Sequence, residues 1–390
     1  MEKEPIYVEK IIPGGEALGQ LKNGKKIFFW NALPKETVIN YQIIKNKSNY
    51  TEAIATEIAD ISKYRIKPKD NCFLSTSPWQ IFDYSYELKT KQELVKEIFR
   101  EHEIDIIEPI IITDKRDYYY RNKMEYALYW NNSINKIELS FHERGSHRKI
   151  PIKKSSIERS EIFDYALKVV QELNSKHEEA REYQSLLLRC NQKGEISGGL
   201  YENKKPHPSF NNLTDRILEK KYFYSPNGFF QINLPVYEMA LNEIKKYITT
   251  EKVLDLYAGV GTIGLSVASD KKLTLVECDK FAYKELANNY KNTLKKEHLD
   301  IVLSKSEEAL NYIQPSQTVI LDPPRAGCDR KLIDKINEIK PQTIVYLSCN
   351  PSTQARDIKL LLDNYKIINI KTFNFFPHTP HIENLVVLSL

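Results

Sequence analysis

The chain has 390 residues, of which 41% are hydrophobic and 28% are charged, and its formal net charge is +5. This length predicts two or three domains, and this composition is ordinary for a protein that buries a core. No apolar run is long enough to cross a bilayer, and the charged residues 1–10 are unlike a signal peptide. We therefore expect a cytoplasmic protein without membrane-spanning segments, and we expect it to be a monomer.

The first 60 residues predict a small all-β barrel. Short alternating segments are separated by turn signals, among them Pro13-Gly14-Gly15 and Asn23-Gly24. An Asn-Gly pair between alternating runs is a strong hairpin signal. Several short strands in so few residues are typical of a small barrel.

Residues 61–220 predict a central, mainly β domain. Residues 83–102 have the spacing of an amphipathic helix, which we expect to pack on the C-terminal domain. Strands are predicted over residues 118–130, 137–142 and 149–152.

Two basic and aromatic clusters occur in this region, at residues 118–123 and 141–149. They include Arg121, Asn122, Lys123 and Arg148. Any single cation among them is better explained as a solvent-exposed residue on the edge of a sheet. Together, and in a chain with 24 tyrosines, the clusters favour an RNA-binding surface.

Residues 221–390 predict a doubly wound, mostly parallel sheet, so that the whole chain is a multidomain α/β protein. Short apolar runs alternate with helical patterns. The runs are residues 252–257, 273–277, 318–321, 343–348 and 385–390. Ligands of such sheets bind beyond the carboxyl ends of the strands.

The first of these strands leads into a glycine turn that predicts a nucleoside site. Gly259 and Gly261 let the backbone approach a ligand, and Glu277 at the next strand end can accept hydrogen bonds from ribose hydroxyls. Both features also fit an NAD-dependent dehydrogenase. Asp255, four residues before the first glycine, favours an S-adenosylmethionine enzyme, but the dehydrogenase remains an alternative.

Two later strand ends carry candidate catalytic groups. Asp322 precedes two prolines, which make a rigid turn that can hold its carboxylate against the N3–H of uracil, although an Asp there can also cap a helix. Cys349 lies between a strand and a helix N-terminus, where positive partial charge favours a thiolate. The other cysteines lack such a setting, and their scatter argues against a disulfide framework or a zinc site: Cys72, Cys190, Cys278 and Cys328.

Near the C-terminus, His378, His381 and Glu383 precede the last strand. Their spacing does not support a metal site, and Glu383 is better explained as a general base. A thiol that attacks carbon 6 of uracil makes carbon 5 nucleophilic, and a base must later remove the carbon 5 proton. Cys349, Asp322 and Glu383 are the minimum set for that chemistry.

With these motifs the chain resembles the RNA (uracil-5-)methyltransferases, which make 5-methyluridine in tRNA or 23S rRNA. The most specific segments are residues 322–327, 348–357 and 376–383. The resemblance implies a Rossmann-like class I methyltransferase sheet, an N-terminal TRAM-like barrel, S-adenosyl-L-methionine as cofactor and RNA as partner. It also implies that Cys349 is the nucleophile, Glu383 the proton acceptor, and Asp322 a contact to substrate and cofactor.

The resemblance further implies cofactor contacts for Gln231, Tyr257 and Glu277, and it places Asn233 in the segment leading into the methyltransferase domain. Many members bind an iron–sulfur cluster through four cysteines, but here only Cys72 stands in the matching stretch. Leu74, Ser77 and Ser155 fall about where the others would lie, so we expect no cluster. Lys305 departs from the family near the adenine, and no contact is assigned to it.

Beside the dehydrogenase, a non-catalytic RNA-binding protein is the second alternative, and two other methyltransferase classes fit less well. A non-catalytic RNA-binding protein would leave the coincidence of three catalytic groups unexplained. RNA cytosine-5 methyltransferases generally use two cysteines at two strand ends, and this chain lacks the second. Amino-group methyltransferases usually follow the two prolines with an aromatic residue, where this chain has Arg325.

Overall fold

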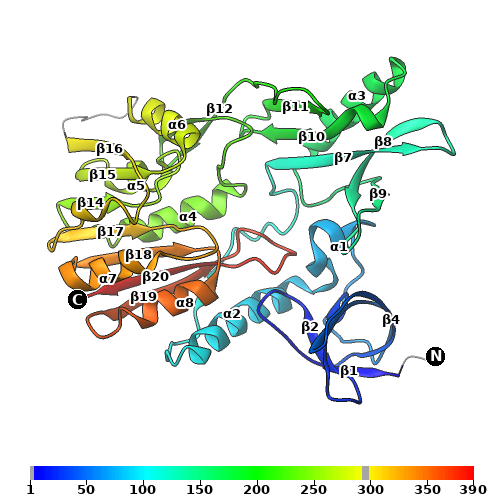
Figure 1. The fold of residues 1–390 in the computed structure, drawn as a ribbon, viewed down its shortest axis with the longest axis horizontal. Helices are drawn as coiled ribbons and strands as arrows, with labels where there is room; N and C mark the ends of the chain where they lie inside the picture. Colours follow the sequence, from blue (N-terminus) through cyan, green and yellow to red (C-terminus); the bar gives the residue numbers. More distant parts are fainter. Residues whose placement is uncertain (1–3, 292–297) are drawn as a thin grey trace.

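The N-terminal barrel predicted from the sequence is confirmed in the computed structural model, which describes residues 4–291 and 298–390. Five strands close it in the order β1-β2-β3-β5-β4. They are β1 Ile6–Ile11, β2 Ala17–Gln20, β3 Lys26–Trp30, β4 Thr37–Asn46 and β5 Tyr50–Ala59. The barrel lies at one end of the molecule, below the central sheet in Figure 1.

The central region is built on a five-stranded sheet of order β11-β10-β7-β8-β9, with α3 (Ser160–Ser175) packed against it. Its strands are β7 Lys123–Asn131, β8 Lys136–His142, β9 Lys149–Pro151, β10 Tyr183–Cys190 and β11 Ile196–Glu202. The predicted strand over residues 118–130 was wrong at its start. Tyr119 has a φ of +56°, and this left-handed conformation breaks an extended strand.

The third sheet has eight strands in the order β16-β15-β14-β17-β18-β20-β19-β6. They are β6 Ile110–Ile112, β14 Lys252–Asp255, β15 Lys272–Glu277, β16 Leu299–Leu303, β17 Gln317–Leu321, β18 Thr343–Ser348, β19 Lys366–Phe373 and β20 Glu383–Ser389. Strands β14 to β18 are parallel, and β20 is antiparallel to β18, which confirms the mostly parallel sheet. A hairpin of β12 (Leu213–Ile217) and β13 (Lys220–Tyr224) precedes it in the chain.

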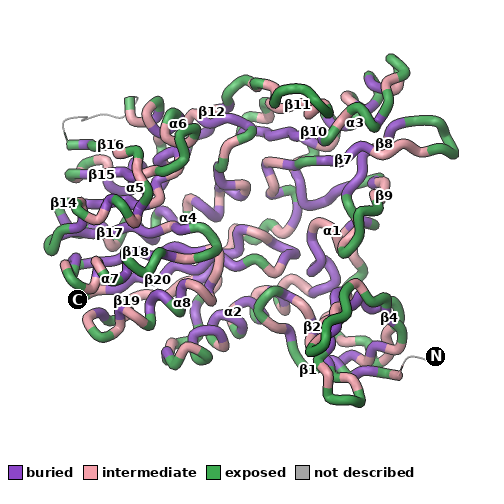
Figure 2. The backbone as a smooth tube through the Cα atoms, in the orientation of Figure 1, coloured by how far each residue is buried: buried purple, intermediate pink, exposed green. Residues whose placement is uncertain are grey.

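Helices cover both faces of this sheet because alternate strand residues point to opposite sides. One apolar cluster joins Leu254 and Val319 to the helices α2 (Tyr84–Glu101), α7 (Arg330–Ile339) and α8 (Pro351–Lys359). The other joins Val253 and Ile320 to α4 (Leu234–Lys245), α5 (Thr262–Ala268) and α6 (Lys280–Lys291). Most of the sheet is therefore buried between two helical layers (Figure 2).

Helix α2 connects the barrel side of the molecule to the sheet. It follows the short helix α1 (Phe73–Thr76) and begins after Asp83, whose carboxylate accepts from the backbone N–H of Ser85. It packs on α8, and β6, which follows it, adds to the sheet edge beside β19. Part of the predicted central region thus lies in the C-terminal layer. None of the described helices combines the length and apolar character needed to cross a bilayer.

Candidate active site

Strand register brings Cys349 and Glu383 together. In the antiparallel pair β18–β20, Ser348 lies opposite Asn384. Cys349 directly follows β18, and Glu383 is the residue before Asn384 on β20, so both lie where this strand pair ends. The charge of Glu383 is near enough to raise the pKa of Cys349.

Asp322 follows the neighbouring strand. In the parallel pair β17–β18, Leu321 lies opposite Tyr346, and both strands end at the same edge of the sheet. All three sequence-predicted catalytic residues therefore lie at one edge. This is the place where ligands of open α/β sheets bind.

The start of α8 fixes these strand ends relative to one another. Gln354, fully buried, donates through Nε2 to the carbonyl oxygens of Tyr346 (2.8 Å) and Asn384 (3.0 Å). Asn384 returns a bond from Nδ2 to Gln354 Oε1 (2.8 Å). The helix thereby joins β18 to β20 one residue from Glu383.

The turn after Asp322 is held by the same helix. Asn350 Nδ2 and Thr353 Oγ1 donate to the carbonyl oxygen of Arg325, at 2.9 and 3.2 Å. Arg356 Nη2 donates to the carbonyl oxygen of Ala326 (3.0 Å). Pro323 and Pro324 have no backbone N–H, and apart from the bond from the Gly327 amide to the Pro324 carbonyl oxygen (2.9 Å) these side-chain bonds from the start of α8 orient the turn.

Burial dominates the electrostatics of the site. Glu383 is 5% exposed, and burial together with the charge of Asp322 raises its pKa well above the usual range. Burial, followed by the charge of Asp255, raises the pKa of Asp322 to about 7. Asp322 can therefore exchange a proton near neutrality, and the raised pKa of Glu383 makes it a stronger proton acceptor once it is ionised.

The expectation that the helix N-terminus favours a Cys349 thiolate is contradicted. Burial, followed by the charges of Glu383 and Asp322, raises the pKa of Cys349 to about 11. The Asn350 side chain accepts from the Ser352 amide (3.2 Å), so one free donor of the helix end is already satisfied. Burial and two carboxyl groups therefore outweigh the helix end.

Arg325 and His381 belong to the site and were missed in the sequence. Arg325 Nη2 lies 2.9 Å from His381 Nδ1, and its charge lowers the pKa of both Cys349 and Glu383. Burial, followed by Arg325, lowers the pKa of His381 to about 4, so its imidazole is neutral at physiological pH. The only sequence signal was a cation directly after the proline turn.

The glycine turn after β14 fits a nucleoside. Gly259 (φ +56°) has open space where a side chain would stand, so a ligand can approach its backbone. Glu277, at the end of β15, accepts from the Gly259 amide through Oε2 (2.7 Å). Gly261 (φ +89°) begins α5.

Asp255, at the end of β14, binds the backbone of the helix that follows this turn. It is fully buried, and its Oδ2 accepts from the Gly264 amide (2.9 Å). Its Oδ1 is buried without a hydrogen-bond partner, and burial raises the pKa of Asp255 to about 7. A buried carboxyl group with a raised pKa and an unpartnered oxygen is typical of a binding site rather than of a purely structural turn.

The other residues predicted to contact the cofactor lie after β14 and before α4. Tyr257 is half-buried directly after β14. Gln231 is buried before α4, and its carbonyl oxygen accepts from Asn122 Nδ2 (3.1 Å). Asn233 Nδ2 donates to the carbonyl oxygen of Phe375 (3.1 Å), close in sequence to Glu383.

The predicted RNA-binding residues differ in exposure. Asn122 is buried, and Lys123 donates to the carbonyl oxygens of Asn227 (3.2 Å) and Gly228 (3.3 Å). Arg121 donates to the carbonyl oxygen of Lys123 (2.9 Å). Burial and the nearby Arg189 lower the pKa of Lys123 to about 8. These three residues shape the junction of the central sheet with the segment before α4.

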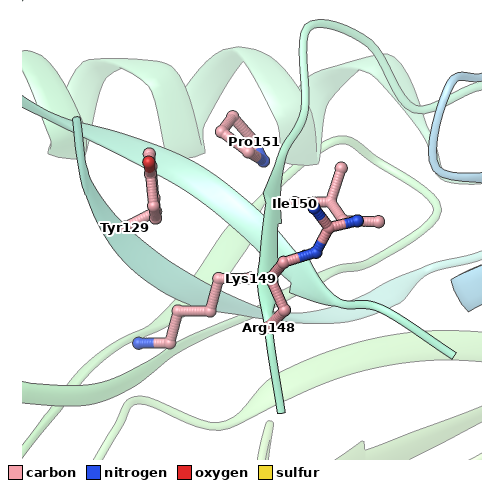
Figure 3. Close-up of a pocket in the computed structure, with 5 residues that line it drawn as sticks. All are labelled: Tyr129, Arg148, Lys149, Ile150 and Pro151. Carbon is pink, nitrogen blue, oxygen red and sulfur yellow. The ribbon is translucent and has the colours of Figure 1, made fainter. Parts of the chain in front are cut away.

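Arg148 is the exposed member of this set. It forms an ion pair with Glu143 and lines a surface hollow of about 500 Å³ with Tyr129, Lys149 and Ile150 (Figure 3). Arg148 and Lys149 extend from the strand in opposite directions. The hollow lies on the central sheet rather than at the edge that carries Cys349, so it is not the catalytic site.

The remaining thiols and histidines do not form a second centre. Burial raises the pKa of Cys72 and Cys328 to about 12 and that of Cys190 to about 11, while Cys278 is exposed. Among residues 4–291 and 298–390, no three His, Cys, Asp or Glu side chains gather as metal ligands.

Known proteins resemble the chain in sequence and fold. Residues 310–390 match the model of the tRNA (Uracil-5-)-methyltransferase family. An uncharacterised RNA methyltransferase of Enterococcus faecalis is 28% identical over 100% of this chain and 98% of its own, and one of Bacillus anthracis is 26% identical over 99% and 96%. The crystal structure of Pyrococcus abyssi tRNA (uracil-54, C5)-methyltransferase in complex with S-adenosyl-L-homocysteine superposes with a TM-score of 0.76 at 23% identity, over 100% of both chains. This likeness confirms the fold.

Proposed function

We propose, from the premise that this chain is an RNA methyltransferase related to the RNA (uracil-5-)methyltransferases, that it methylates carbon 5 of a uridine through a covalent adduct with Cys349. The observation that carries the proposal is that Cys349 directly follows β18 where Glu383 begins the neighbouring strand β20, with Asp322 at the end of the adjacent strand β17. A nucleophile and a base side by side are what this chemistry needs.

Cys349 forms the bond that activates the ring. Its thiolate adds to carbon 6 of uracil, and the electron pair of the 5,6 double bond moves into an enolate at carbon 4 and its oxygen. Arg325 supplies a positive charge that favours the thiolate. Asp322 holds the ring by accepting from N3–H, a bond that only its ionised or suitably turned carboxyl group can make.

Glu383 completes the reaction. Once carbon 5 carries the methyl group, ionised Glu383 takes the proton of carbon 5, the double bond forms again, and the bond between carbon 6 and sulfur breaks. The proton therefore ends on Glu383 and the electron pair on Cys349. Its raised pKa makes Glu383 a stronger base than a solvent-exposed carboxylate, once it is ionised.

S-Adenosyl-L-methionine, when bound, supplies an electrophilic methyl group on a positively charged sulfur. The residues that fit it are Gly259, with its open side, Gly261, and Glu277 for the ribose. Gln231, Tyr257 and Asp322 border the same edge and would hold the amino-acid end. Asp255, with its unpartnered oxygen, supports the turn beneath.

The RNA substrate we propose is 23S rRNA or tRNA. The TRAM-like barrel slightly favours rRNA as the substrate, whereas the family model and the Pyrococcus abyssi enzyme are named for tRNA. Mapping 5-methyluridine by mass spectrometry in rRNA and tRNA from a strain that lacks the gene separates the two. The site without the modification identifies the substrate.

The covalent step is tested with RNA that contains 5-fluorouridine at the mapped position. Fluorine cannot leave carbon 5 as a proton does, so the adduct persists after methyl transfer. We expect a cross-link that requires S-adenosylmethionine and maps to the peptide with Cys349. A cross-link at another residue, or methylation without any adduct, contradicts the proposal. Protection by NAD instead of S-adenosylmethionine favours the dehydrogenase, and RNA binding without methylation favours a non-catalytic protein.

A further inference from the structure

The loop that joins β19 to β20, residues 374–382, ends directly at the proposed base. Phe373 and Glu383 lie opposite each other in the β19–β20 pair, so this hairpin loop starts and closes beside Glu383. In Figure 1 it reaches from the sheet toward the barrel and the central region. The loop therefore enters β20 at Glu383 itself.

A buried ion pair on α2 binds this loop. Glu87 and Lys91 are both 0% exposed, and Lys91 Nζ lies 2.8 Å from Glu87 Oε1. Lys91 Nζ also donates to Asn374 Oδ1 (2.7 Å) and to the carbonyl oxygen of Phe376 (3.1 Å). Glu87 Oε2 accepts from the backbone N–H of His378 (2.9 Å).

These bonds hold a backbone that would not keep this shape unaided. His378 has a φ of +59°, in the left-handed region that non-glycine residues seldom occupy. The bond from its amide to Glu87 fixes that residue. Residues in such conformations persist when their surroundings over-determine them, and they cluster at functional sites.

Other elements bind the neighbouring positions of the loop. Asn233 Nδ2 donates to the carbonyl oxygen of Phe375, and Tyr120 Oη to that of Pro377 (2.9 Å). The Trp79 amide donates to the carbonyl oxygen of His378 (3.0 Å). The carbonyl oxygens of four consecutive residues, 375–378, are thus bound by groups from other elements. The imidazole of His378 lies between two carboxyl groups, with Nδ1 3.4 Å from Glu87 Oε2 and Nε2 3.3 Å from Asp117 Oδ2.

A buried ion pair is weak evidence for stability. An apolar pair of similar volume is often as stable, because both charges lose their water. Glu87 and Lys91 also interrupt the apolar stripe of α2 that Leu94 and Ile98 continue. Their side-chain hydrogen bonds instead go to the hairpin loop or to each other, and Lys91 Nζ also lies 5.7 Å from the centroid of the Trp79 ring.

We infer that the Glu87–Lys91 pair positions the hairpin loop so that Glu383 can reach carbon 5 of the bound uracil. The inference rests on the proposed function, because it assigns the pair to the proton-removal step. Glu87 and Lys91 are positioning residues: they act through the loop and do not touch the ring.

The test removes both charges together, since a single substitution would leave the other charge buried alone. In Glu87→Gln/Lys91→Met we expect kcat to fall about 100-fold, as a misplacement on the order of 1 Å can cause, with KM for RNA unchanged. The covalent adduct should accumulate on ordinary uridine RNA, as in Glu383→Gln. The matched control is Lys89→Met/Glu93→Gln, an exposed pair with the same spacing on the same helix, which should retain wild-type kcat.

A double-mutant cycle distinguishes positioning from general stability. In the Glu383→Gln background, adding Glu87→Gln/Lys91→Met should lower kcat only slightly further, because proton removal, the step that the pair assists, is already lost. A full further loss in kcat, or a lower active fraction with normal kcat per active site, overturns the inference. Tyr120→Phe, which removes only the bond to Pro377, should give the same adduct to a smaller extent. If Glu383→Gln itself accumulates no adduct, the proposed function fails; if it does and the pair variant does not, only this inference fails.

Discussion

The edge of the eight-stranded sheet and the basic-aromatic segments of the central region were both predicted to be functional, but they are built differently. At the sheet edge, Cys349, Asp322 and Glu383 come from segments far apart in the chain and meet because each ends or begins a strand. In the central region, Arg121 and Lys123 lie close in sequence, but both donate to nearby carbonyl oxygens. Strand ends predict where side chains meet, whereas a cluster of cations does not predict which way they turn.

The largest effect is expected from Cys349→Ala. Without the sulfur no adduct forms and carbon 5 stays a poor nucleophile, so methylation of RNA should fall below detection and the 5-fluorouridine cross-link should disappear. Cys278→Ala is the matched control, because that thiol is exposed at the end of β15 and should be dispensable. Methylation by Cys349→Ala would show that Cys349 is not the nucleophile.

Glu383→Gln should have the next largest effect. General-base catalysis contributes about 10²- to 10⁴-fold, so the rate of product formation should fall within that range. Because Gln cannot take the carbon 5 proton, the methylated adduct should build up on ordinary RNA and be visible by denaturing electrophoresis. Slow turnover without any adduct would place the loss before proton removal.

Much of the sheet and of its catalytic edge could be predicted from the sequence, and the residues that were not predicted have physical reasons. The apolar runs before Asp322 and Cys349 defined buried strands, and their alternation with helices defined the sheet. Glu87 and Lys91 were missed because an i,i+4 pair of opposite charge is common on exposed helix faces. Only the fold reveals that this face of α2 is covered by the hairpin loop.

The pKa of Cys349 could not be predicted from the sequence either. A helix N-terminus is visible in the order of residues, but the burial and the two carboxyl groups that raise the pKa come from three separate elements. Arg325 was visible only as a cation after two prolines. Its role depends on the approach of His381 from the last hairpin.

Arg325→Gln tests this electrostatic balance. Cys349 reacts as the thiolate and Glu383 acts when ionised, so wild-type adduct formation should rise with pH. Removing the positive charge that lowers the pKa of Cys349 should move the midpoint upward, by about one pH unit at most for an exposed group. Because the pKa of Cys349 is about 11, the shift is read below the midpoint: at pH 8 and at pH 9 the variant should form the 5-fluorouridine cross-link up to about tenfold more slowly than the wild type. An unchanged rate at both pH values would mean that Arg325 does not influence the thiol.

Asp255→Asn tests the cofactor side through stability. The folded pKa of Asp255 is raised from 3.8 to about 7, so the folded chain holds this proton more tightly than the unfolded chain. Its contribution to stability is present below pH 3.8 and is lost as the pH rises toward 7. The variant carries no charge, so it should match the wild type at pH 4 and melt several degrees higher at pH 8. Thermal unfolding at both pH values checks this, and an equal difference at each would exclude titration as the cause.

The smallest effect is expected from Arg148→Ala. Arg148 is largely exposed and paired with Glu143, so it can exchange that partner for an RNA phosphate at little cost. Losing one phosphate contact should weaken RNA binding a few-fold at every sequence and reduce the slope of log affinity against log salt by about 1. Arg330→Ala, an exposed ion-paired arginine on α7, is the matched control and should leave the slope unchanged. Equal slopes for the two variants would mean that Arg148 belongs to a solvated sheet edge. The RNA-binding surface would then lie outside the basic and aromatic clusters at residues 118–123 and 141–149.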